Sequence, residues 1–264
     1  MTTTPFDLTG QVAVVTGSSR GIGRASAELL AQLGAKVVIS SRKADACKEV
    51  ADGINKAGGD AHVIPCNISR HDEVKALIAG ATKHYGKIDI LVCNAAVNPY
   101  YGPLLDITDE AFDKIMGSNV KSNVWLCAGA IPQMAERGKG SVIIVSSIGG
   151  LRGSTVIGAY GISKAADFAL CRSLAGEWGP KGVRVNCVAP GLVKTAFSPR
   201  AVGGRGAAEA SLRHHAAAAD RRAARDRRRG RLSRLRCLDL HDRSDHRGRR
   251  RRDHGRGVNN APLK

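Results

Sequence analysis

The 264-residue sequence is poor in several features, and each shortage excludes a class of protein. Its seven cysteines are odd in number and show no C-x-x-C spacing, which argues against a disulfide framework and a zinc site. No run reaches the roughly 18 apolar residues of a membrane span, and the start "MTTTPFDLTG" has no apolar signal core. We therefore expect a soluble cytoplasmic protein with no structural metal and no membrane partner.

Acidic residues are also scarce, but only near the end of the chain. Residues 1–199 hold 21 Lys and Arg against 16 Asp and Glu, whereas residues 200–264 hold 20 against 7, and 19 of those 20 are Arg. Residues 200–264 also contain no Ile, Phe, Tyr, Trp or Met, so they cannot bury enough apolar surface to form a core. The sequence thus divides into a domain at 1–199 and an aberrant Arg-rich tail at 200–264.

Within residues 1–199, short β-branched runs alternate with longer amphipathic segments, a pattern typical of an α/β protein. Strands this apolar are buried on both faces of a parallel sheet. Gly34 and Gly86 stand where two of the intervening helices should end. The pattern predicts a Rossmann-type doubly wound parallel sheet with helices on both faces. Its six strands are expected in "VAVVTG", "KVVISS", "AHVIP", "IDILVCN", "SVIIVSS" and "VRVNCVAP".

A glycine-rich segment, "VVTGSSRGIGRA", joins the first predicted strand to a helix. Gly17, Gly21 and Gly23 allow the backbone to turn tightly and approach a pyrophosphate at the positive end of that helix. The alternative is a tight strand-to-helix turn with no ligand. The flanking strand and helix favour a dinucleotide site.

The second predicted strand ends at Ser41 and Arg42, where an NAD-selective site usually has an acidic residue. A hydroxyl and a guanidinium suit a 2′-phosphate, and Arg20 in the glycine loop offers a second cation. We therefore expect NADP(H) as the cofactor. The alternative for Arg42 is a solvated surface charge.

Ser147, Tyr160 and Lys164 form a second candidate constellation. Tyr160 and Lys164 are four residues apart, so they share a helix face, and an ammonium beside a phenol favours the phenolate. Such a tyrosine could exchange protons near neutral pH, with Ser147 hydrogen-bonding the substrate oxygen. Taken alone, the Y-x-x-x-K spacing also fits an ordinary exposed helix face.

Together these motifs make residues 8–199 resemble the classical subgroup of the short-chain dehydrogenase/reductase family. The resemblance also rests on "NAA" at Asn94, on Asn119 in "GSNV", and on "PG" at Pro190 followed by Thr195. It implies an oxidoreductase that interconverts a carbonyl and an alcohol by hydride transfer, and a homotetramer.

By the same resemblance, Tyr160 is the general acid/base, Lys164 lowers its pKa and binds the nicotinamide ribose, and Ser147 orients the carbonyl. Asn119 holds a water in the proton relay. The implied cofactor-binding residues are Gly17, Ser19, Arg20, Gly21, Ile22, Gly23, Ser41, Arg42, Asn67, Ile68, Asn94, Ala95, Tyr160, Lys164, Pro190, Gly191, Val193 and Thr195.

Two positions depart from the family pattern: Asn67 replaces an aspartate that contacts adenine, and Ala96 replaces a glycine. The segments "CNAAVNPYYGPLLD" and "VNCVAPGLVKTAFS" look most similar to NADPH-dependent carbonyl and retinal reductases, with 3-oxoacyl-carrier-protein reductases as the alternative. A fairly apolar substrate pocket is one interpretation of a further set of side chains, with plain core packing as the other. These are Tyr100, Tyr101, Leu151 and Ile157.

The family ends with a strand similar to "TGQ-x-[IV]-x-VDGG", which the tail lacks. We consider a shifted reading frame, in which the last two bases of each codon are read with the first base of the next codon. From His241 onward, the genetic code then allows the sequence Met-Thr-Gly-Gln-Thr-Ile-Val-Val-Asp-Gly-Gly-Val-Thr. The same operation permits Thr-Pro-Leu-Arg-Arg-Ile-Gly-Glu-Pro from His215 and Arg-Ala-Leu-Trp-Glu-Asp-Glu from Pro199. We interpret residues from about Pro199 onward as an out-of-frame translation of a family C-terminus.

Three hypotheses remain open from the sequence. The first is an NADP-dependent oxidoreductase whose Arg-rich tail carries no selected function. The second is a dehydrogenase-like domain whose tail binds nucleic acid, which its net charge of +13 permits but its lack of stacking aromatics disfavours. The third is an inactive protein, since loss of the last strand leaves the sixth as an open edge.

Overall fold

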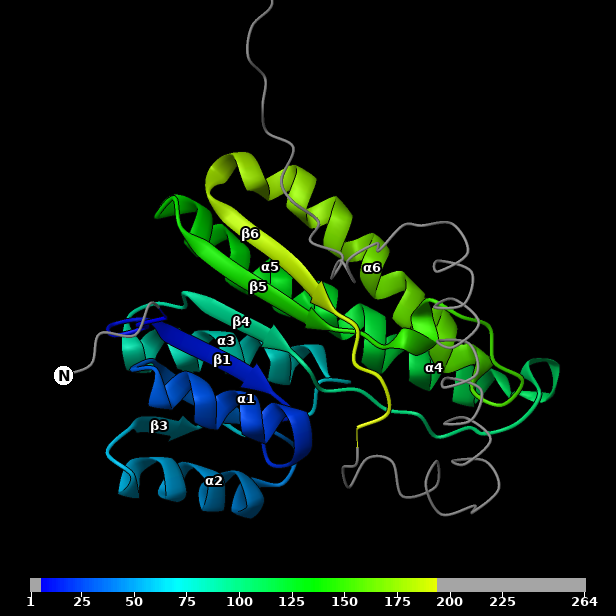
Figure 1. Ribbon diagram of the computed structural model, residues 1–264, viewed down its shortest axis with the longest axis horizontal. Helices are drawn as coiled ribbons and strands as arrows, with labels where there is room; N and C mark the ends of the chain where they lie inside the picture. Colours follow the sequence, from blue (N-terminus) through cyan, green and yellow to red (C-terminus); the bar gives the residue numbers. More distant parts are fainter. Residues whose placement is uncertain (1–5, 194–264) are drawn as a thin grey trace, which may run out of the picture. The chain divides into compact units, whose positions relative to one another are not determined.

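The computed structural model describes residues 6–193 of the chain, and the predictions for the Arg-rich tail and for Thr195 lie outside these residues. The described part contains one parallel sheet, with strand order β3-β2-β1-β4-β5-β6 (Figure 1). All six strands predicted from the sequence are confirmed. They are β1 (Val12–Thr16), β2 (Lys36–Ser40), β3 (Asp60–Val63), β4 (Ile90–Cys93), β5 (Gly140–Val145) and β6 (Val183–Val188).

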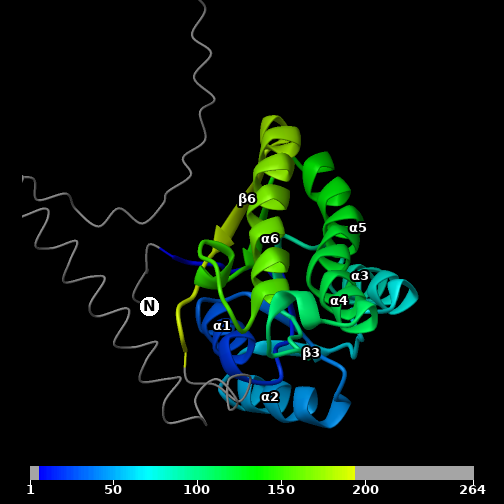
Figure 2. The same cartoon turned by 90° about the vertical axis from the view of Figure 1, so that its right-hand side faces the viewer.

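Helices cover both faces of the sheet, as the doubly wound pattern predicts (Figures 1 and 2). One face packs on α1 (Gly21–Gln32) and α2 (Ala44–Lys56). The other packs on α3 (His71–Tyr85), α5 (Ser122–Glu136) and α6 (Gly158–Trp178). Shorter elements are η1 (Leu104–Asp106), α4 (Asp109–Met116), the π-helical turn η2 (Gly117–Lys121), η3 (Ile148–Gly150) and η4 (Gly179–Lys181). Within residues 6–193, no helix is both long and apolar enough to cross a membrane.

Glycine ends two helices where the sequence predicts it. Gly34 follows α1 with a φ of 95°, and Gly86 caps α3 with a φ of 81°. Residues with a Cβ rarely adopt this left-handed conformation. The Gly86 N–H donates to the Thr82 carbonyl and completes the last turn of α3. Both turns lie at the end of the sheet opposite to the motifs, because each precedes a strand.

Burial differs between the centre of the sheet and its β6 side. Every residue of β1 and β4 is buried, which explains their unbroken apolar runs. In β6, burial alternates between the face that packs on α6 and the opposite face, where Val188 is 49% exposed. Since β6 pairs only with β5 among the described residues, it is the edge of this part of the sheet.

Candidate active site

The predicted site residues follow strands that end at one edge of the sheet. The order places β1 beside β4, although they are far apart in sequence, and sheets of this kind bind ligands where the strand order reverses, at the carboxyl ends of the strands. The glycine loop follows β1, Asn94 follows β4, Ser147 follows β5 and Pro190 follows β6. The topology therefore brings both sequence motifs to the same edge of the sheet (Figure 1).

The glycine loop has a conformation and a packing that require glycine. Gly17 and Gly21 have φ values of 66° and 58°, in the left-handed region. Gly23 is buried, and a Cβ there would collide with the Asn94 side-chain amide and the Gly17 carbonyl oxygen. Arg20, the residue before α1, makes no side-chain capping bond within the described residues. The N–H groups of the first turn of α1 are thus available to an anion.

Two hydroxyls, whose roles the sequence does not predict, hold this loop. The Ser18 hydroxyl donates to the Val15 carbonyl at 2.8 Å and accepts from the Ser40 N–H at 2.8 Å, which ties the loop to the end of β2. Thr16 Oγ1 accepts from the backbone N–H groups of Asn94 and Ala95 at 3.1 and 3.2 Å. No periodicity signals such bonds, because their partners are distant in sequence.

Asn94 holds the glycine loop from the β4 side. Its side-chain amide donates to the Thr16 carbonyl at 2.8 Å and to the Gly17 carbonyl at 3.3 Å. These bonds fix the first turn of the glycine loop against the loop after β4. Asn94 therefore supports the cofactor loop, whichever group it contacts directly.

At the end of β2, Ser41 is half-buried and Arg42 is exposed. The Ser41 hydroxyl lies 3.1 Å from Cys47 Sγ, and Arg20 in the glycine loop is also exposed. After β3, Ile68 is buried, and the half-buried Asn67 uses its side-chain oxygen to accept from the Ser69 N–H at 3.1 Å. The structure therefore leaves both arginines on the surface at this edge.

The predicted constellation of Ser147, Tyr160 and Lys164 is assembled. Lys164 Nζ lies 5.8 Å from the centre of the Tyr160 ring, so the two share the face of α6 that the sequence predicts. A side-chain hydrogen bond joins Ser147 to Tyr160. Ser147 Oγ also accepts from the Gly149 N–H at 3.0 Å, which fixes its place at the start of η3.

The pKa of Tyr160 is raised to about 12, chiefly because the phenol is buried. The negative charge of Asp167 contributes to this rise, and the hydrogen bond with Ser147 opposes it. Asp167, which was not predicted from the sequence, lies 3.0 Å from the Lys164 ammonium. Its negative charge offsets the positive charge that Lys164 places beside the phenol.

Asn119 lies on the π-helical turn η2, which interrupts the helical run between α4 and α5. Its side chain is fully buried, accepts from the Val97 N–H at 2.8 Å, and donates to the Val97 carbonyl and Ser163 Oγ, both at 3.0 Å. The side chain thus fastens the loop after β4 to α6. Single π-helical turns of this kind occur frequently at functional sites.

The segment after β6 lies beside η3, next to Ser147. The Pro190 carbonyl accepts from the Ile148 N–H at 3.1 Å, and Gly191 and Val193 are exposed. Ser19, Gly21 and Ile22 are half-buried in the glycine loop. Of the predicted site residues, Thr195 alone lies beyond the described part of the chain.

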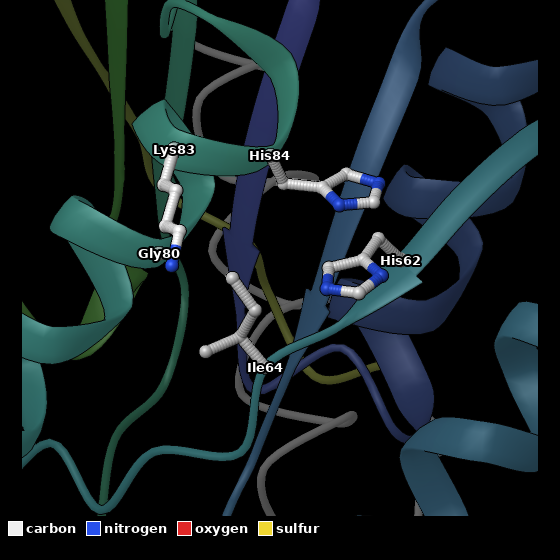
Figure 3. Close-up of a pocket in the computed structure, with 5 residues that line it drawn as sticks. All are labelled: His62, Ile64, Gly80, Lys83 and His84. Carbon is white, nitrogen blue, oxygen red and sulfur yellow. The ribbon is translucent and has the colours of Figure 1, made fainter.

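A separate hollow lies at the β3 side of the sheet, and none of the candidate residues lines it (Figure 3). The rings of His62 and His84 stack there with their centres 3.7 Å apart, and burial lowers the pKa of His62. Across residues 6–193, no three His, Cys, Asp or Glu side chains are grouped so as to hold a metal ion.

Comparison with known proteins identifies the family. The short chain dehydrogenase family profile matches residues 11–203. Dehydrogenase/reductase SDR family member 4 from Homo sapiens is 44% identical over 191 residues, covering 72% of this chain and 69% of that protein.

Two solved structures extend the likeness to the fold. A short-chain dehydrogenase/reductase from Mycobacterium marinum is 35% identical, with a TM-score of 0.72 over 75% of this chain and 79% of that one. A metagenomic short-chain oxidoreductase in complex with NADP is 38% identical, with a TM-score of 0.68 over 71% and 85%. The chain belongs to the short-chain dehydrogenase family of oxidoreductases.

Proposed function

We propose that this oxidoreductase uses NADP(H) to interconvert a small-molecule carbonyl and the corresponding alcohol, with Tyr160 as the general acid/base. The observation that carries the proposal is the position of Tyr160. It is hydrogen-bonded to Ser147 and lies beside the Lys164 ammonium, at the sheet edge where the glycine loop opens α1.

The residues at this edge of the sheet fit a dinucleotide. Gly23 allows the start of α1 to pack directly on the Gly17 backbone, where a Cβ would collide, and the uncapped first turn of α1 suits a pyrophosphate. Arg42 and Ser41 would hold the 2′-phosphate that distinguishes NADP(H) from NAD(H), with Arg20 as a second cation. When bound, the nicotinamide supplies the hydride. A relative that is 38% identical was solved with NADP, which supports this choice.

The chain's own residues then handle the proton. Tyr160 Oη donates a proton to the carbonyl oxygen during reduction and accepts one from the alcohol during oxidation. Ser147 Oγ hydrogen-bonds the same substrate oxygen and orients it. Lys164 contributes positive charge beside the phenol and binds the nicotinamide ribose, while the Asn119 segment holds a water in the proton relay.

Exposed apolar side chains near the start of α6 suit an apolar substrate. They are Leu104, which lies beside Gly158, and Leu151 and Val156 in the preceding loop. Tyr101 lies close enough to Tyr160 to raise its pKa. We propose an apolar carbonyl substrate, a homotetramer and a cytoplasmic location. The Arg-rich tail at 200–264 is assigned no part in the reaction, and its out-of-frame origin is part of the proposal.

The test is an assay of NADPH and NADH oxidation against a panel of carbonyl compounds, using protein from a resequenced gene. The panel contains an aryl ketone, an α-diketone, retinal and a 3-oxoacyl thioester. We expect turnover of at least one apolar carbonyl with NADPH. Turnover of the thioester alone would favour the acyl-reductase alternative, and failure to bind NADPH would contradict the proposal.

A further inference from the structure

Lys164 and Asp167 form an ion pair inside the protein. Lys164 is 2% exposed and Asp167 is fully buried, and Lys164 Nζ donates to Asp167 Oδ2 at 3.0 Å. The ammonium also donates to the Val145 carbonyl at 2.9 Å. Two of its three N–H bonds are therefore directed away from Tyr160, although the three side chains share α6.

The other carboxylate oxygen connects this pair to the π-helical turn. Asn123 Nδ2 donates to Asp167 Oδ1 at 3.0 Å and to the Asn119 carbonyl at 2.8 Å. Asn123 is itself buried. Asp167 therefore has a partner on each oxygen, which is the condition for a carboxylate to remain charged in an interior.

We propose that Asp167 is a positioning residue, the buried counter-ion of Lys164, and that it sets the pH range in which Tyr160 can release its proton. This inference rests on the proposed function of Tyr160. Asp167 holds the ammonium in place and at the same time offsets its charge. The phenol therefore receives less electrostatic help than Lys164 alone would give.

The other titratable groups around the pair do not duplicate this role. They are the thiols of Cys93 on β4, Cys127 on α5, Cys171 on α6 and Cys187 on β6, and the phenols of Tyr160 and Tyr101. The pKa values of Cys93, Cys171 and Cys187 are raised, so these thiols are neutral near pH 7. None of these groups is a carboxylate, so the negative charge beside Lys164 comes from Asp167.

The direction of the effect follows from charge alone. Burial raises the pKa of Asp167, and the bonds from Lys164 and Asn123 oppose this rise. A carboxylate near a phenol disfavours the phenolate. Replacing Asp167 by a neutral side chain therefore lowers the pKa of Tyr160.

The decisive measurement is the titration of Tyr160 by tyrosinate absorbance, in the complex with NADP⁺ and with the Tyr160→Phe protein as background. Asp167→Asn keeps the shape of the side chain and removes its charge, and Asp167→Ser is a second neutral variant. We expect both to lower the pKa of Tyr160 by about one pH unit. Glu177→Gln removes an exposed charge from the same helix and should leave the titration unchanged.

A Tyr160 titration that does not move in either variant, or that moves upward, would overturn the inference. Alcohol oxidation gives a second readout, because its acid limb should shift to lower pH by the same amount in the Asp167 variants. A purely structural role would reduce turnover at every pH and leave the limb in place. The absorbance titration needs no substrate, so its outcome does not depend on which carbonyl the enzyme reduces, and failure to bind NADP⁺ would count against the proposed function and not against this inference.

Discussion

Lys164 is a buried cation whose removal leaves Asp167 buried without its ionic partner. Breaking such a pair from one side costs about 3–5 kcal/mol of unfolding free energy. We expect Lys164→Met to lose about this much near pH 7, measured by urea unfolding, and Lys164→Met with Asp167→Asn to recover much of it. Recovery is the critical result, because additive losses would mean that the two side chains do not interact.

The pH dependence of the Lys164→Met variant has a defined sign. Burial raises the pKa of Asp167, and without the ammonium nothing but Asn123 opposes this rise. A carboxyl whose pKa is higher in the folded state destabilises the fold once pH exceeds its unfolded pKa of about 3.9. The variant should therefore lose stability relative to the unmodified protein as pH rises from 4 toward 8. A constant difference would contradict this.

Arg42 is the residue on which cofactor choice depends in this account. Arg42→Leu should raise the KM for NADPH by roughly 10- to 150-fold, the equivalent of a charge-assisted contact of about 1.5–3 kcal/mol, with much less effect on NADH. Lys56→Leu, which removes an exposed charge from the end of α2, serves as the matched control. Equal use of both cofactors by the unmodified enzyme would contradict the assignment.

The sequence predicts the residues with a local signature and misses those that act through distant partners. Tyr160 and Lys164 are recognisable from helical spacing, and Arg42 from its place after a strand. Asp167 lies one further turn along the same helix face, three residues after Lys164, but nothing in the sequence shows that this face is buried. Ser18 is not predicted either, because its hydroxyl accepts from the Ser40 N–H on β2, which is distant in sequence.

Substitution of two helical glycines by alanine tests whether the glycine loop tolerates a Cβ. Gly23→Ala places a Cβ against the Gly17 backbone and should destabilise the fold by about 1–3 kcal/mol and abolish NADPH binding. Gly53 in α2 has no neighbouring atom within 4 Å of an added Cβ, so Gly53→Ala should stabilise by about 0.5–1 kcal/mol. Thermal unfolding and NADPH titration check both, and similar effects of the two changes would contradict the loop assignment.

At the scale of elements, the alternation of apolar runs with amphipathic segments predicts the six strands and the helices between them, and burial on both faces explains the unbroken apolar runs of β1 and β4. It does not predict the π-helical turn η2. In that turn, Asn119 bonds to Val97 in the loop after β4 and to Ser163 on α6, and both partners are distant in sequence. Local propensity contains no information about such bonds.

For the whole molecule, the Arg-rich segment yields a prediction about the gene product. If residues from about Pro199 onward are out of frame, protein from the resequenced gene should differ in intact mass from the sequence as written. It should also contain a long tryptic peptide that includes Thr-Gly-Gln-Thr-Ile-Val-Val-Asp-Gly-Gly. The written tail would instead give many short fragments, because trypsin cleaves after arginine. Detection of fragments specific to the written tail in active protein would contradict the frame argument.

The central claim is that Tyr160 transfers the proton, and one substitution tests it most directly. Tyr160→Phe keeps the ring and its contacts and removes the hydroxyl. NADPH-dependent carbonyl reduction by this variant should fall by at least about 10²–10⁴-fold, the contribution of a general acid, while its affinity for NADPH changes little. Retention of most of the turnover by a folded Tyr160→Phe protein would contradict the mechanism.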